Sequence, residues 1–336
     1  MKKPFGLLPD GRQVSLYTIH CGALEAAVTD FGATLVSLWA PDKGGNRADV
    51  VLGFDDVSGY LGCSAYLGAT VGRNANRIGG ATFQLGGKTY TLAKNDGENN
   101  CHSGPDSYGY RLWDVAEHTE SSLRLTLDSP DGDQGFPGNA KVSVTYTMEA
   151  DGLAITYDGV CDRDTVFNMT NHAYFNMYGH ENGHKALDQI LSMSARTFAV
   201  ADAASIPTGE LRSVENTPMD FRTPKPLGRD IDADYEPLKL QAGYDHSFEV
   251  FCNPCAILSD PESGRTMSVI TDCPGVQVYS ANFLDTTGKG GARYGRRSGV
   301  CLETQYHPDA LNNPQWAQPV TKAGERYHSQ TKFLFA

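Results

Sequence analysis

Three side chains in the sequence could exchange protons with a bound molecule: two histidines and one glutamate. His172 lies in the run N-M-T-N-H-A-Y-F-N-M, whose aromatic residues are typical of a packed strand. Glu303 lies in the apolar run G-V-C-L-E-T-Q, where burial would raise the pKa of its carboxyl group. His102 lies in the turn N-N-C-H-S-G, where glycine lets a backbone approach a ligand closely. Each group also has a structural explanation, as a satisfied core histidine, a buried salt bridge or a polar turn residue.

Arginine, amide and carboxylate groups at two other places suit the hydroxyl groups of a small polyol. The run V-G-R-N-A-N-R-I-G-G holds Arg73 and Arg77, with Asn76 between them, in an otherwise acidic chain. The run G-Y-D-H-S-F places Asp245 between aromatic residues that could form a wall for a sugar. A surface arginine pair and an ordinary turn are the structural alternatives. Together these groups predict general acid–base chemistry on a small polyol, without separating a glycosidase from an isomerase.

Several other chemistries lack their sequence signatures. There is no H-E-x-x-H motif, phosphate loop or serine elbow, and Cys252 and Cys255 have no second pair to complete a zinc site. We therefore expect neither a metal ion nor a cofactor. The formal net charge of −12 disfavours nucleic acid and membrane surfaces as partners, so a small neutral substrate fits better. With no export signal or spanning apolar run, we expect reduced cysteines in a cytoplasmic protein.

Short alternating apolar runs recur along the chain and predict the strands that would position these groups. Val142, Val144 and Tyr146 alternate with polar residues in one such run. Asp-Gly and Gly-Gly pairs between the runs predict tight turns. Long helical patterns are absent, and only residues 199–204 suggest a helical turn. The sequence predicts a single all-β domain over residues 1–336, a large antiparallel β-sandwich with few short helices.

The order of the motifs resembles the aldose 1-epimerase (galactose mutarotase) family over nearly the whole chain. The matching stretches are G-R-x-A-N-R-I (72–78), C-H-S-G (101–104), R-L-W-D (111–114), D-G-D-Q-G-F-P-G-N (131–139), T-N-H-A-Y-F-N (170–176), G-Y-D-H (243–246), G-V-Q-V-Y (275–279), N-F-L-D (282–285) and L-E-T-Q (302–305). The resemblance implies a galactose mutarotase-like supersandwich, in agreement with the strand pattern. It also implies interconversion of the α and β anomers of free aldohexoses such as galactose and glucose. We expect a free monosaccharide as the partner and a monomer or weak dimer.

The resemblance further implies a role for each candidate residue. Glu303 would be the general base on the anomeric hydroxyl, and His172 the general acid on the ring oxygen, with His102 near that oxygen. The implied sugar-binding positions are Asn76, Arg77, Asp245 and Gln277, with Arg73 as an additional candidate. We expect Glu303 to be ionised and His172 protonated near neutral pH. We also expect the asparagines that flank His172 to fix the orientation of its ring.

Two departures from the family pattern and three alternative functions remain open at this point. Ser103 stands where the family usually has glycine, which leaves the sugar preference open, and His307 is not expected in the site. One alternative is a glycoside hydrolase that uses Glu303 and Asp245 as a carboxylate pair. Another is a catalytically silent sugar-binding module. The third is a related enzyme that acts on another aldose or on a phosphorylated one. The arginines of the 286–297 loop, which is a candidate lid, would favour a phosphorylated substrate.

Overall fold

The computed structural model describes residues 1–336, and three antiparallel sheets dominate it. The nine-stranded sheet has the order β11 (Asp114–His118), β12 (Ser122–Ser129), β13 (Ala140–Met148), β14 (Gly152–Cys161), β30 (Arg326–Phe335), β24 (Thr266–Thr271), β23 (Ala256–Ser259), β18 (Ile190–Met193) and β21 (Lys225–Pro226). The six-stranded sheet has the order β17 (Tyr174–Phe175), β28 (Val300–Gln305), β25 (Gly275–Tyr279), β22 (Asp245–Val250), β19 (Ala195–Ala201) and β20 (Pro207–Ser213). The five-stranded sheet follows chain order, with β1 (Lys2–Leu7), β2 (Gln13–Cys21), β3 (Leu24–Thr29), β4 (Thr34–Pro41) and β5 (Arg47–Asp49).

Short two-stranded ribbons and very short helices complete the fold. The ribbons pair β6 (Thr70–Val71) with β16 (Thr170–Asn171), β7 (Arg77–Ile78) with β10 (Asn100–Cys101), β8 (Thr82–Leu85) with β9 (Lys88–Thr91), β15 (Thr165–Val166) with β29 (Val320–Thr321), and β26 (Thr286–Thr287) with β27 (Arg293–Tyr294). The α-helices are α1 (Val57–Leu61) and α2 (Glu236–Leu240). None of the helices has the length and apolar character needed to cross a membrane. The predicted all-β class with few short helices is confirmed.

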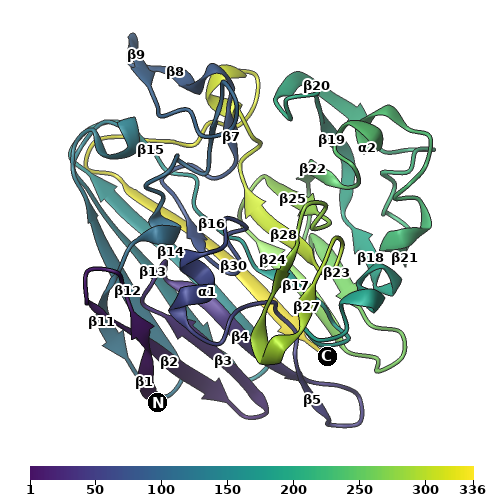
Figure 1. Ribbon diagram of the computed structural model, residues 1–336. Helices are drawn as coiled ribbons and strands as arrows, with labels where there is room; N and C mark the ends of the chain where they lie inside the picture. The colour runs from purple at the N-terminus through teal and green to yellow at the C-terminus, as the bar shows by residue number, and fades with distance from the viewer.

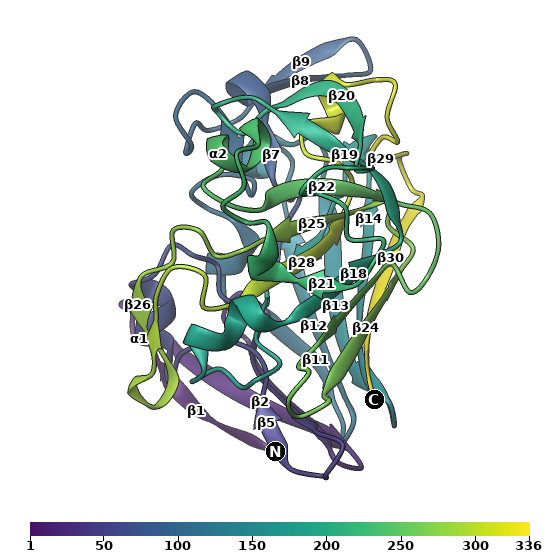
Figure 2. The ribbon, with the colours of Figure 1, turned by 90° about the vertical axis from the view of Figure 1, so that its right-hand side faces the viewer.

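The sheets pack in layers around a shared hydrophobic core. The five-stranded sheet packs on the β12–β13 part of the large sheet, as the purple and teal strands show (Figure 1). Strands β19, β22, β25 and β28 run across the long strands of the nine-stranded sheet (Figure 2). One continuous cluster of 53 buried hydrophobic residues draws on all three sheets. A sandwich of this kind buries one face of each sheet and leaves the connecting loops free to carry polar groups.

The strand β13 shows how the sequence pattern produces this packing. Val142, Val144 and Tyr146 are each at most 2% exposed, and they belong to the core that also includes residues of β2 and β3. Because side chains alternate between the two faces of a strand, this spacing places all three on one face. The predicted sandwich is therefore built from the alternation that the sequence displays.

Two local expectations about the backbone were wrong. Residues 199–204 form no helical turn, because β19 runs to Ala201 and the Asp202 carboxylate then accepts hydrogen bonds from backbone amides in a tight turn. The stretch around His172 is two short strands, β16 and β17, rather than one.

The 286–297 loop is anchored to the core by Lys289. Its buried ammonium group pairs with Asp49 and donates hydrogen bonds to two backbone carbonyls of the core.

Candidate active site

A cleft of about 400 Å³ opens where strands β22, β25 and β28 meet the ribbon β7–β10 and the loops around it. The predicted site residues that line it are Asn76, Arg77, His102, His172, Asp245 and Glu303. These positions are separated by up to 227 residues in sequence, and only the sheet packing brings them together. Arg73 and Gln277 do not line this cleft.

Each proton-transfer group is held by the backbone on which it lies. Glu303 lies in β28, a strand that is buried along its whole length and pairs with β25. His172 lies between β16 and β17, where its N–H donates to the Ala69 carbonyl and its own carbonyl accepts from Gly68. His102 follows β10 with a φ of +50°. Its ring Nδ1 accepts a hydrogen bond from the backbone N–H of Asn76. These contacts leave Nε2 of His102 free to face the cleft.

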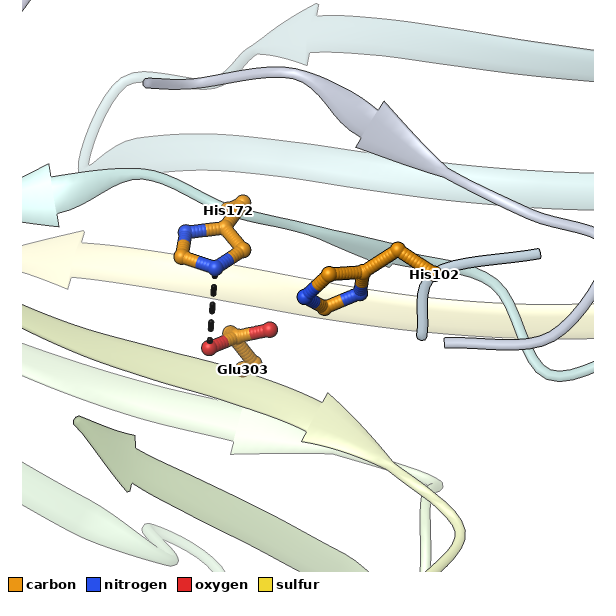
Figure 3. Close-up of side chains that lie close together, drawn as sticks. All are labelled: His102, His172 and Glu303. Carbon is orange, nitrogen blue, oxygen red and sulfur yellow. Dashed lines mark ion pairs between the residues drawn. The ribbon is translucent and has the colours of Figure 1, made fainter. Parts of the chain in front are cut away.

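The three groups point toward one another (Figure 3). Nε2 of His172 lies 3.7 Å from Oε1 of Glu303, and the two side chains are 8% and 2% exposed. The rings of His102 and His172 lie edge to face, with their centroids 5.3 Å apart. A ring nitrogen of each histidine and a carboxylate oxygen of Glu303 all lie within 4.8 Å of one another. The second oxygen of Glu303, Oε2, is buried and has no hydrogen-bond partner in the protein, as is typical of a group that awaits a ligand.

Burial sets the protonation of this pair. Burial raises the pKa of Glu303 well above its usual range, the charge of Asp245 adds to the rise, and Arg77 opposes it. Burial also lowers the pKa of His172 to about 4. The pKa of His102 lies well below its usual value because of burial, with smaller contributions from the nearby His172 and Arg77. Burial therefore favours the uncharged form of each group, a neutral imidazole at His172 and a protonated carboxyl group at Glu303.

Both pKa shifts run against the predicted resting state, a protonated imidazole beside an ionised carboxylate. The cost of desolvation falls on both charged forms, and no opposing charge outweighs it at either group. The proton count is nevertheless the one that acid–base catalysis requires. Moving one proton from Glu303 to His172 produces a base and an acid without exchange with solvent.

The polar end of the cleft is a network around Arg77. Its Nε donates to Asp96 at 2.7 Å, and its Nη1 lies 3.7 Å from Asp245. Gln277 donates to Asp245 at 2.6 Å from behind the cleft wall, and across the strand pair it lies opposite Glu303. Burial raises the pKa of Asp245, while Arg77 and the Gln277 amide lower it. Gln277 therefore orients Asp245, whereas Arg77 and Asp245 face the cleft directly.

Arg73 is a predicted site residue that the structure places in the protein interior, away from the cleft. Its side chain is completely buried, and its guanidinium donates to Ser129, Thr165 and the carbonyls of Pro137 and Gly138. These bonds hold the loop around residues 129–138 beneath the cleft. Direct contact between Arg73 and a sugar in this cleft is excluded because every donor is already directed into the protein.

The asparagines around His172 do not contact its ring, so the expectation that they orient it was wrong. Asn171 donates to the Gly68 carbonyl, Asn176 donates to the carbonyls of two neighbouring loops, and Asn168 accepts from a backbone amide. They join loops to strands and thereby fix the backbone at His172. The ring itself is stacked between aromatic side chains.

Several aromatic side chains of the cleft were not among the predicted site residues. Tyr66 has a φ of +55° and lies over both histidine rings. Tyr279 and Phe283 also line the cleft, and Phe283 is 74% exposed. Aromatic faces of this kind stack on the apolar faces of sugar rings. A strand pattern could place Tyr279, but only the tertiary structure places Tyr66.

The two departures from the family pattern lie at the margin of the site or outside it. Ser103 has a φ of +67°, a backbone conformation that favours glycine, and its hydroxyl exchanges hydrogen bonds with the backbone of Asn74. It therefore shapes the histidine turn rather than the cleft wall. His307 bonds to Ser247 and packs on Trp316, away from the cleft.

Comparisons with known proteins agree with this fold and with the resemblance of the motifs. The profile of the aldose 1-epimerase family matches residues 15–334. The chain is 39% identical to the galactose mutarotase of Bos taurus, over 99% of this chain and 97% of that protein. It is also 39% identical to the aldose 1-epimerase of Haemophilus influenzae, with 97% of each covered. This chain belongs to the aldose 1-epimerase family, which confirms the predicted family and class of enzyme.

Solved structures give the same result for the fold. The aldose epimerase homologue from C. elegans superposes with a TM-score of 0.89 at 33% identity, covering 96% of this chain and 99% of that one. The galactose 1-epimerase from Lactobacillus acidophilus superposes with a TM-score of 0.87 at 27% identity, covering 100% and 98%. The predicted galactose mutarotase-like sandwich is therefore confirmed.

Proposed function

We propose that this protein interconverts the α and β anomers of free aldohexoses, with galactose and glucose as substrates. The observation that carries the proposal is the buried Glu303–His172 pair, whose side chains lie 3.7 Å apart and face a cleft lined with sugar-binding side-chain types. The names of the relatives, galactose mutarotase and aldose 1-epimerase, support the same choice.

Ring opening needs one proton to leave the anomeric hydroxyl and another to reach the ring oxygen. As the ionised base, Glu303 takes the proton of the C1 hydroxyl, and His172 gives its Nε2 proton to the ring oxygen while the C1–O5 bond breaks. The products of this step are a C1 aldehyde and a C5 hydroxyl group. Rotation about C1–C2 presents the other face of the aldehyde. As the ring closes, His172 takes its proton back from the C5 hydroxyl group and Glu303 returns its proton to the C1 oxygen.

Sugar binding promotes the charge-separated form of the pair. Hydroxyl groups that bond to the unpartnered Glu303 Oε2 would stabilise the carboxylate, and the released proton moves to His172. His102 lies edge to face with His172, near the position of the ring oxygen. Arg77 and Asp245 hold the hydroxyl groups at the far end of the cleft, so the anomeric centre stays within reach of both proton-transfer groups.

The alternative functions find less support in the site. Arg293, Arg296 and Arg297 do not line the cleft, and each bonds to a carboxylate or a backbone carbonyl near its own loop. A phosphorylated sugar therefore has no cation cluster to bind. Asp245 is tied to Gln277 and Arg77, which suits a sugar contact better than the second carboxylate of a hydrolase.

Polarimetry on freshly dissolved α-galactose and α-glucose tests the proposal. We expect rapid relaxation of the optical rotation with the wild type. With Glu303→Gln or His172→Asn the rate should fall about 10²- to 10⁴-fold, the usual contribution of a positioned acid or base.

A matched control exists on the surface. His20 and Glu120 form an exposed histidine–glutamate pair at 3.4 Å. His20→Asn and Glu120→Gln change the same side-chain types and should leave the rate unchanged. A wild type that relaxes no faster than buffer on several aldoses would refute the proposed function.

A further inference from the structure

The ring of His172 is held in its plane by stacking but not in its orientation within that plane. The ring of Tyr174 lies 5.1 Å away at an interplanar angle of 27°, and that of Tyr66 lies 6.1 Å away at 23°. A half-turn about the Cβ–Cγ bond would preserve both stacks. It would also move Nε2 away from Glu303 and replace it with a carbon atom. A polar partner on the other ring nitrogen is needed to prevent this.

Cys301 is the partner of that nitrogen. Its Sγ lies 3.5 Å from Nδ1 of His172, and the thiol is completely buried. Tyr174 and Cys301 are paired residues of β17 and β28, so the strand register fixes the thiol beside the ring. The polar groups within reach of the imidazole are thus Cys301 at Nδ1 and Glu303 at Nε2.

We propose that Cys301 is a positioning residue: its sulfur accepts the Nδ1–H of His172 and holds the ring in the tautomer that directs Nε2 toward Glu303 and the sugar. The catalytic meaning of this assignment rests on the proposed function. During ring opening the Nε2 proton passes to the ring oxygen and later returns. The Nδ1 proton stays in place throughout, bonded to the sulfur, so the thiol neither gains nor loses a proton.

A thiol suits this position better than a carboxylate. Burial raises the pKa of Cys301 well above its usual value, with the charges of Glu303 and Asp245 adding to the effect, so the group stays neutral. A neutral acceptor orients the imidazole without stabilising its cation. A carboxylate at the same place would raise the pKa of His172 and weaken it as an acid.

Nuclear magnetic resonance of ¹⁵N-histidine-labelled protein at pH 7, without sugar, tests the assignment directly. The ring of His172 should show the Nδ1–H tautomer in the wild type and in Cys301→Ser, whose hydroxyl oxygen is also an acceptor. In Cys301→Ala the Nε2–H tautomer should gain population. Cys255→Ala removes another buried thiol, one that bonds to the Val269 carbonyl, and should leave His172 unchanged.

Kinetics supply the second measurement. For Cys301→Ala we expect kcat to fall about five- to tenfold with an unchanged KM, which is the effect of losing one weak hydrogen bond to a group that acts in the transition state. Cys301→Ser should restore most of the rate. An Nε2–H tautomer in the wild type, or one that does not respond to Cys301→Ala, would overturn the assignment. An inactive wild type that still shows the Nδ1–H tautomer would instead overturn the proposed function and leave the assignment of the hydrogen bond supported.

Discussion

Replacing Glu303 with glutamine should stabilise the folded protein near neutral pH although it slows catalysis. The carboxyl group is 2% exposed, and its pKa is raised well above 4.5 by burial and by the charge of Asp245. In the unfolded chain the same group ionises near pH 4.5. Between these two values the folded protein holds a proton that the unfolded chain has released, so rising pH favours unfolding.

The size of the effect follows from proton linkage. The stabilising contribution of Glu303 is complete below pH 4.5 and is lost as the pH rises through the folded-state pKa. Each pH unit in that window lowers the free energy of unfolding of the wild type by about 1.4 kcal/mol relative to a variant that cannot ionise. Glutamine has nearly the same shape as glutamate, so no cavity term obscures the comparison.

Urea unfolding of the wild type, Glu303→Gln and the surface control Glu120→Gln at pH 5, 6 and 7 measures this difference. The advantage of Glu303→Gln over the wild type should grow by about 1.4 kcal/mol per pH unit above pH 4.5, until the pH reaches the folded-state pKa of Glu303. The Glu120→Gln curve should follow the wild type, since that side chain is 78% exposed. If the free energies of unfolding of the wild type and Glu303→Gln changed equally with pH, Glu303 would ionise as easily in the folded protein as in the unfolded chain. That result would refute the inference that burial favours the protonated carboxyl group.

Two further substitutions separate structural residues from sugar contacts. Arg73→Met should lower the free energy of unfolding by roughly 3–5 kcal/mol, because it leaves several buried acceptors unpaired. The KM of its folded fraction should stay near the wild-type value, and a KM as high as that of Arg77→Met would show that Arg73 contacts the sugar after all. Gln277→Met should raise KM about fivefold through the loss of one hydrogen bond to Asp245. A change in kcat alone would instead indicate that Gln277 positions Glu303, its neighbour across the strand pair.

The sequence alone predicted the fold class because alternation is a local property. The spacing of Val142, Val144 and Tyr146 appears in β13 as expected, and tight turns follow the glycine pairs. The motif resemblance also predicted six residues that the structure brings into one cleft. Residue types and motif order carry this information, because a motif is recognised from residues that are consecutive in the sequence.

The tertiary structure decided which groups meet and what charge they carry. Arg73 and Arg77 belong to one motif, yet one guanidinium lies in the core and the other in the cleft. The stacking of Tyr66 and the contact of Cys301 with His172 join segments that are more than a hundred residues apart. The protonation of Glu303 depends on desolvation by all the elements packed around it. Desolvation is a property of the surrounding volume, and the sequence written as a line does not contain it.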